Sequence, residues 1–198
     1  MWSQARRGRR ESYLFFQREF KLSPGFNEAA FWINACNEYQ LYFNGRLVGV
    51  GVPYCSEEIT YLERYDVSAC VEAGANVIAV VVRDVNRPQY KCGSMKGGVW
   101  CQLDVDDAPL VWSGEEWSMA DDLYFNGNQP QRGLGEDYCE RVNLNSYPYG
   151  WDEPGGLQKE IWAAPTRVVD MGEYSSRVSA SFLTPLTAEE SAEPQGYV

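Results

Sequence analysis

Histidine is absent from the 198 residues, and its absence removes several classes of chemistry at once. Without His, neither a Ser-His-Asp nor a Cys-His nucleophile system can be built, and no His-ligated metal site can form. The six cysteines form no C-x-x-C pair, so neither a zinc site nor a redox motif is predicted. We interpret them as small buried residues of a reducing compartment, with pairing left open for an exported form.

Long apolar runs and positive charge are also scarce. No run approaches the roughly 20 residues that a membrane span requires. Because 17 basic residues face 28 acidic ones, the net charge of −11 argues against binding to nucleic acid. The arginine cluster in residues 6–10 precedes an apolar stretch too short for a secretory signal. We therefore expect a cytoplasmic protein with neither a membrane nor a nucleic acid as partner.

Short β-rich segments separated by turn residues fill the first half of the chain. Strands are predicted at 15–22, 30–36, 59–66 and 99–105, with a hairpin around Asn44-Gly45 and a further strand at Val111-Trp112. The unbroken apolar run 77–82 is typical of a buried central strand. No comparable stretch has helical spacing, and residues 124–156 read as long ordered loops. The pattern predicts an all-β fold, an antiparallel sandwich with long carboxyl-terminal loops.

Three regions are predicted along the chain. Residues 1–12 read as a flexible amino-terminal segment, and residues 13–186 as one β-sandwich accessory domain. Residues 187–198 are rich in Glu and small polar residues, as expected of an acidic linker to a missing downstream domain.

Eight motifs follow one another along the chain: Asn37–Gly49, Tyr65–Val67, Ala73–Val82, Gly97–Trp100, Gly114–Trp117, Gly135–Tyr138, Gly150–Gly155 with Trp162, and Leu183–Leu186. Together they resemble the amino-terminal sandwich of bacterial α-L-rhamnosidases and related glycosidases. The resemblance runs from about Phe15 to Leu186 and implies a galactose-binding-like jelly roll. The chain has Asn143-Leu144 where many rhamnosidases have Asp-Ala. In that family the catalytic carboxylates lie in a downstream helical barrel, so no catalytic residue is carried over.

Acidic pairs are frequent, but no recognisable motif places two of them for glycoside hydrolysis, which needs carboxylates on both sides of the scissile bond. We interpret these pairs as solvated surface and predict no catalytic residue, no cofactor and no assigned metal ligand. Asp104, Asp106 and Asp107 are the candidates for a structural calcium, although their loop lacks the Gly and terminal Glu of an EF-hand. Asp66 is interpreted as an acceptor for backbone N–H groups of the following turn.

The order of the strands predicts where a binding site would lie. If successive strands run antiparallel, the turns after Cys36, Gly51 and Asp84 meet at one end of the sandwich, opposite Asn44-Gly45. That end carries the long loops 52–58 and 85–98, and sites concentrate on such loops. Trp100 is added because it shares an exposed strand face with Gln102 and Asp104. The predicted carbohydrate-binding residues are Asn37, Glu38, Tyr54, Glu57, Asn86, Arg87, Tyr90, Lys91 and Trp100.

The leading functional hypothesis is a non-catalytic domain that braces the substrate entrance of a rhamnosidase-like glycoside hydrolase. Its partner would be the downstream catalytic domain of the same polypeptide, on which the long loops would dock. The alternatives are an independent carbohydrate-binding module and a protein-interaction domain without a sugar role. A large apolar patch in the carboxyl half favours bracing, whereas an exposed aromatic residue beside Arg and an acid favours sugar binding.

Overall fold

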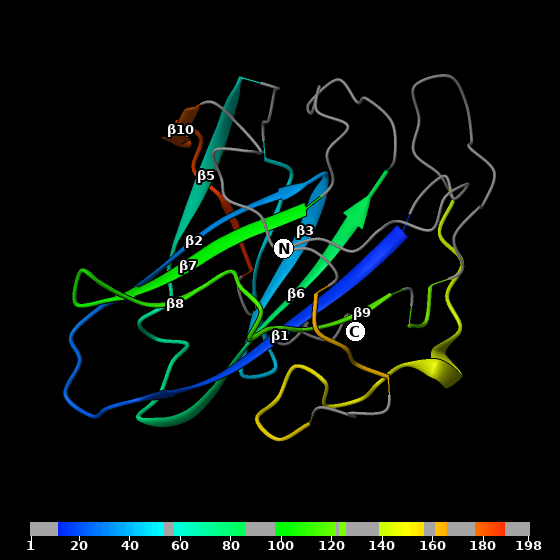
Figure 1. Ribbon diagram of the computed structural model, residues 1–198, viewed down its shortest axis with the longest axis horizontal. Helices are drawn as coiled ribbons and strands as arrows, with labels where there is room; N and C mark the ends of the chain where they lie inside the picture. Colours follow the sequence, from blue (N-terminus) through cyan, green and yellow to red (C-terminus); the bar gives the residue numbers. More distant parts are fainter. Residues whose placement is uncertain are drawn as a thin grey trace, which may run out of the picture.

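Two β-sheets face each other in the computed structural model, which describes residues 12–53, 58–85, 98–121, 123–125, 139–156, 161–165 and 177–188 (Figure 1). The six-stranded sheet has the order β11-β4-β3-β6-β1-β9, and the five-stranded sheet has the order β10-β5-β2-β7-β8. The elements are β1 (Ser12–Leu22), β2 (Ala29–Cys36), β3 (Glu38–Phe43), β4 (Arg46–Gly51), β5 (Ile59–Asp66), β6 (Gly74–Asp84), β7 (Gly98–Val105), β8 (Ala108–Trp112), β9 (Ser118–Asp121), the 3-10 helix η1 (Leu144–Ser146), β10 (Arg177–Ala180) and β11 (Leu186–Thr187).

The predicted hairpin around Asn44-Gly45 joins β3 to β4. Both turn residues have positive φ, 50° for Asn44 and 80° for Gly45, as the type I′ turn requires. The Asn44 side chain also ties the turn to β6, because its Oδ1 accepts the Val77 N–H at 2.8 Å. Its Nδ2 donates to the Cys70 carbonyl at 3.0 Å. The hairpin is therefore fixed both by its own backbone and by the neighbouring strand.

The apolar run in β6 is buried on both faces of the six-stranded sheet. Ile78 and its alternate neighbours enter the core between the sheets, while Val77 and its alternate neighbours enter a second cluster. That cluster is closed by the carboxyl-terminal loops: the Trp151 ring meets Phe15 edge-on at 5.3 Å and stacks on Trp162 at 5.7 Å. The described residues of 124–156, which were predicted as loops, thus form a layer packed over the six-stranded sheet.

Segment 177–188 pairs with one edge strand of each sheet. β10 runs parallel to β5, and β11 runs antiparallel to β4. Thr187 pairs with Gly49, and the Ala188 N–H donates to the Val48 carbonyl at 2.8 Å. Backbone pairing with the six-stranded sheet therefore continues through Ala188, and the division at 186 stays a prediction. At the other terminus, Ser12 already pairs in β1.

The predicted antiparallel β-sandwich is confirmed, with β10–β5 as a parallel pair. The jelly-roll and galactose-binding-like classification stays a prediction. So do the flexible amino-terminal segment and the acidic linker, whose residues 1–11 and 189–198 lie outside the described residues. Among the residues that the structure describes, no helix is long and apolar enough to cross a membrane.

Candidate functional site

The end of the sandwich predicted from strand order is assembled as expected. Sheet pairing places the start of β1 against the end of β6 and the start of β3 against the end of β4. Asn44-Gly45 lies at the opposite end. Of the nine predicted binding residues, Asn37, Glu38 and Trp100 are described. The other six lie outside the described residues: Tyr54, Glu57, Asn86, Arg87, Tyr90 and Lys91.

Asn37 and Glu38 hold the strand ends together. Asn37 is buried, and its Oδ1 accepts the Val85 N–H at 2.7 Å. The Glu38 carboxylate pairs with Arg83 Nη1 at 3.3 Å. The Arg83 guanidinium in turn lies 5.9 Å from the centre of the Tyr13 ring, a cation–π geometry. These contacts give both predicted residues a structural role, and their sugar-binding role stays a prediction.

Asp84 is a titratable residue at the same end and is not among the nine predicted binding residues. The side chain is buried at the end of β6, and loss of hydration raises the pKa of its carboxyl to about 6. A carboxyl with a shifted pKa is a general sign of a functional site. Burial of a carboxyl at a strand end shifts its pKa in the same way without any function. The signal available in the sequence was its place directly after the apolar run of β6.

A second group of side chains lies on the outer face of the five-stranded sheet. Sheet pairing aligns Arg64 of β5, Trp32 of β2, Gln102 of β7 and Trp112 of β8 in a row across four strands. The neighbours of these residues along each strand, such as Phe31 and Leu103, belong to the core, so the row faces outward. We call Arg64, Trp32, Gln102 and Trp112, together with Asp104, the tryptophan row.

Asp104 fixes the orientation of two members of the row. Its Oδ2 accepts the Trp32 indole N–H at 3.0 Å, and its Oδ1 accepts the Gln102 amide at 2.7 Å. The Arg64 guanidinium lies 5.7 Å from the centre of the Trp32 ring. A hollow of about 60 Å³ opens beside these groups, lined by Glu28, Ala30, Trp32, Arg64, Asp104, Asp106 and Asp107.

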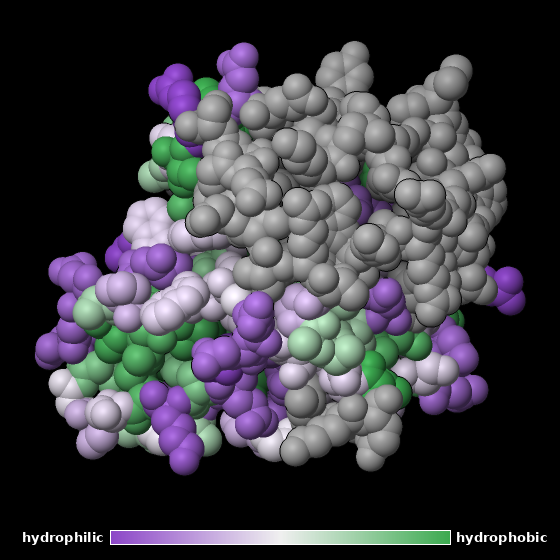
Figure 2. All heavy atoms as spheres, in the orientation of Figure 1, coloured by the Kyte–Doolittle hydropathy of each residue, from purple (hydrophilic) through white to green (hydrophobic). Residues whose placement is uncertain are grey.

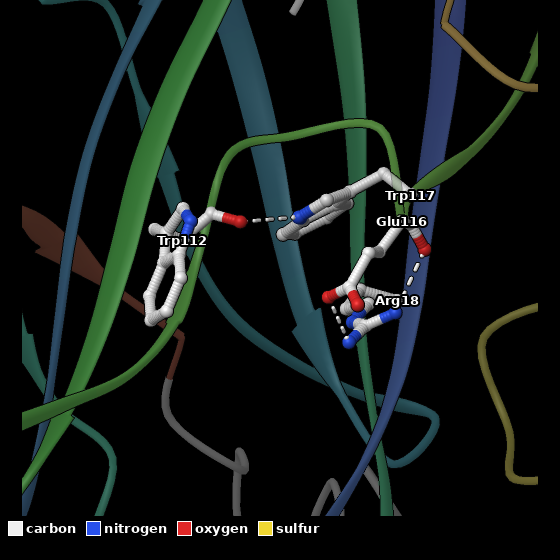
Figure 3. Close-up of polar contacts among 4 residues, drawn as sticks. All are labelled: Arg18, Trp112, Glu116 and Trp117. Atoms are coloured by element: carbon white, nitrogen blue, oxygen red, sulfur yellow. Dashed lines mark hydrogen bonds and ion pairs between the residues drawn. The ribbon is translucent and has the colours of Figure 1, made fainter.

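Trp112 is the most exposed aromatic member of the row, with 60% of its surface accessible. Its carbonyl accepts the indole N–H of the buried Trp117 at 2.9 Å. Figure 3 shows this carbonyl pointing toward Trp117 while the Trp112 ring lies on the other side of the strand. The nearby Arg18–Glu116 ion pair links β1 to the connection between β8 and β9. The backbone of Trp112 is therefore anchored and its ring is left outside.

Trp100 belongs to the same outer face, two residues before Gln102 on β7, and pairs with Asn34. The predicted face of Trp100, Gln102 and Asp104 is thus confirmed, since all three are half-buried beside core neighbours. The other members of the row were missed, because their alignment depends on the register between strands.

The acidic residues of the β7–β8 turn are used by the turn itself. Asp106 and Asp107 have positive φ, and Asp106 Oδ1 accepts the backbone N–H groups of Asn27 and Glu28 at 2.9 and 3.1 Å. These bonds lower the pKa of Asp106. Within the described ranges no group of three or more acidic or cysteine side chains could hold a metal ion. The structural calcium stays a prediction. Asp66 accepts from the backbone and side chain of Ser68, as expected.

A buried polar cluster inside the sandwich was not foreseen. The Tyr39 hydroxyl donates to the Glu63 carboxylate and lies 2.9 Å from the Tyr65 hydroxyl. Burial raises the pKa of Glu63. A Cβ atom added to Gly51 would collide with the Tyr39 ring, so this glycine makes room for the cluster. The enclosure of this polar cluster among core residues indicates a structural role.

Comparison with known proteins gives the fold a context. No family model and no curated protein matches the chain. Among solved structures, the GH78 rhamnosidase of Bacillus sp. GL1 matches with TM-score 0.79 and 20% identity, over 90% of this chain and 19% of its own. The α-L-rhamnosidase of Aspergillus terreus matches with TM-score 0.65 and 20% identity, over 82% and 20%. The α-L-rhamnosidase of Streptomyces avermitilis matches with TM-score 0.55 and 22% identity, over 78% of this chain and 16% of its own.

These likenesses show that the chain has the fold of a part of α-L-rhamnosidases, as the resemblance of its motifs implied. The fold is not confined to bacterial proteins, because the Aspergillus enzyme shares it. The chain spans about a fifth of the length of the solved structures that it matches.

Proposed function

We propose that this chain is a non-catalytic accessory domain of a rhamnosidase-like glycoside hydrolase. The observation that carries the proposal is the match of 90% of the chain to 19% of the Bacillus rhamnosidase. A segment of that size leaves four-fifths of such an enzyme for other domains. The absence of His and of a carboxylate pair placed by a motif supports a role outside the chemistry.

Bracing of a neighbouring domain is supported by the apolar surface of segment 177–188. The exposed fractions of its large apolar residues are 47% for Val178, 74% for Phe182, 51% for Leu183 and 67% for Leu186. Four such side chains within ten residues favour contact with another protein surface. Phe182 also meets the Tyr61 ring edge-on at 5.6 Å, so part of this surface is held in place.

The first test is made on the native polypeptide. Antibodies raised against this chain are used to purify it from its natural source, and its length and rhamnosidase activity are measured. We expect a polypeptide several times longer than 198 residues that hydrolyses an aryl α-L-rhamnoside. A native polypeptide of 198 residues without that activity would contradict the accessory role and favour an independent module.

The second test asks whether the chain by itself is catalytic. We expect no turnover of p-nitrophenyl α-L-rhamnopyranoside by the purified chain, with an α-L-rhamnosidase as positive control. Turnover that disappears on replacing one residue, for example Asp84→Asn or Glu38→Gln, would show that a carboxylate of this domain takes part in hydrolysis.

A further inference from the structure

The tryptophan row is built like a surface that receives a ligand. We infer that it is a saccharide-binding face and that its ligand is a neutral oligosaccharide, bound across β5, β2, β7 and β8 by the side chains of the row. The inference goes beyond the accessory role and does not depend on it.

The spacing of the row suits a chain of sugar rings. Neighbouring strands lie about 4.8 Å apart, so Trp32 and Trp112, on strands separated by β7, are roughly 10 Å apart at their backbones. Arg64 extends the row by one more strand. Indole rings present flat apolar surfaces with a polar edge, which match the apolar faces of pyranose rings. The exposed ring of Trp112 therefore offers a stacking position for one sugar ring, and the half-buried Trp32 with Arg64 over its ring offers contacts for the rings that follow.

Polar groups between the rings are held in place before a ligand arrives. Asp104 accepts hydrogen bonds from both Trp32 and Gln102, so neither side chain needs to be ordered on binding. Preorganised side chains reduce the entropy lost on association. The Gln102 amide donates to Asp104, and its carbonyl oxygen is the group that can accept from a sugar hydroxyl.

The charge of the hollow excludes anionic ligands. Glu28, Asp104, Asp106 and Asp107 line it together with one arginine, and the whole chain carries −11. Phosphate or uronate groups would meet this negative field, whereas hydroxyl groups donate to carboxylates. A volume of about 60 Å³ admits roughly two water-sized groups, such as a hydroxymethyl arm, while the rings lie over the row.

The row also differs from the apolar surface that supports bracing. Val178 and Phe182 belong to segment 177–188, whose β10 forms one edge of the five-stranded sheet, while Trp112 lies on β8 at the opposite edge. In the row, polar side chains alternate with indoles. Such interleaving favours a hydroxyl-rich ligand over a second protein surface, which is typically depleted of charge at its centre.

The test is a titration followed by amide and indole resonances of the labelled protein. The probes are cellohexaose, xylohexaose, mannohexaose and L-rhamnose. We expect at least one hexasaccharide to shift the indole N–H signals of Trp32 and Trp112, with a dissociation constant of about 1 mM. Trp112→Ala and Gln102→Ala should each weaken this binding by about tenfold or more. The unchanged dispersion of the other amide signals verifies that each variant folds.

Tyr149→Ala is the matched control, because Tyr149 is an aromatic residue with 75% exposure outside the row. It should bind as tightly as the unaltered protein. Three results would overturn the inference: no shift with any probe at about 10 mM, shifts centred on Asn37 and Glu38 instead of the row, or undiminished binding by Trp112→Ala. Shifts with the cationic peptide hexalysine, and none with the saccharides, would assign the hollow to basic protein segments. None of these results bears on the length and activity of the native polypeptide.

Discussion

Replacement of Asp84 by Asn should change how the stability of the protein depends on pH. Burial raises the pKa of the Asp84 carboxyl from 3.8 to about 6, so the folded state holds its proton more tightly than the unfolded chain. The contribution of this group to stability is therefore full below about pH 4 and is lost as pH rises through about 6. A shift of roughly two pKa units corresponds to about 3 kcal/mol at neutral pH.

We therefore expect Asp84→Asn to be more stable than the unaltered protein at about pH 7, by up to about 3 kcal/mol, and nearly equal at about pH 4. The assay is urea unfolding at a series of pH values, with the difference between the two proteins plotted against pH. That difference cancels the titration of other groups, such as the buried Glu63, whose pKa is also raised.

Asp66→Asn is the control of opposite sign. Hydrogen bonds from Ser68 lower the pKa of Asp66, so its carboxylate stabilises the fold above its unfolded pKa and the contribution is lost in acid. The variant should lose stability at neutral pH relative to acid. A difference between Asp84→Asn and the unaltered protein that does not vary with pH would refute the reasoning, and so would a loss of stability on replacement that grows with pH.

Two further predictions concern packing. Trp151→Ala should lower the free energy of unfolding by about 3–5 kcal/mol in urea titrations, because the buried ring closes the second cluster over Phe15; a loss below about 1 kcal/mol would mean that the loop layer adds little. Gly51→Ala should cost about 1–3 kcal/mol through its collision with Tyr39, whereas Gly114→Ala, at a site with open space, should be near neutral. Equal effects of the two alanines would contradict the steric explanation.

The strands that could be predicted are those whose own sequence carries a period or a turn signal. Residues 59–66 were predicted as a strand and form β5 with the same bounds. The apolar run 77–82 became the centre of β6, because alternate residues fill two different clusters. The Asn44-Gly45 turn was predicted from the two residues that adopt its positive φ values.

The strands that could not be predicted depend on partners far along the chain. All four residues of β10 are exposed, so no alternation of apolar and polar residues marks it as a strand. Its hydrogen bonds come from β5, more than a hundred residues earlier. β11 has two residues, too few for any pattern.

The predicted end of the sandwich and the tryptophan row also differ in how far the sequence could predict them. Strand order alone was enough to predict which strand ends meet at one end of the sandwich. The tryptophan row needed the register between β5, β2, β7 and β8, which no single segment encodes. Trp112 was predicted within a strand, but its alignment with Trp32 through Gln102 follows from pairing. A sequence reading could have found the row by marking every Trp that alternates with core residues.

The order of strands in the two sheets has a consequence for how copies of this protein meet in solution (Figures 1 and 2). In the part of the chain that the structure describes, the outermost strands are β8, β9, β10 and β11, none longer than five residues. The longest strands, β1 and β6, have 11 residues each and lie inside. Figure 2 shows hydrophilic side chains around several hydrophobic patches on the described surface, with a broad patch at the lower left.

Short outer strands leave few unpaired backbone groups for another chain to extend, and Pro109 in β8 removes one donor more. Among the described residues, the long strands β1 and β6 are therefore shielded from edge-to-edge pairing with other molecules. Removal of residues 177–188 would uncover β4 and β5, which are six and eight residues long. The unpaired backbone groups of these longer edge strands would then be open to pairing with other molecules.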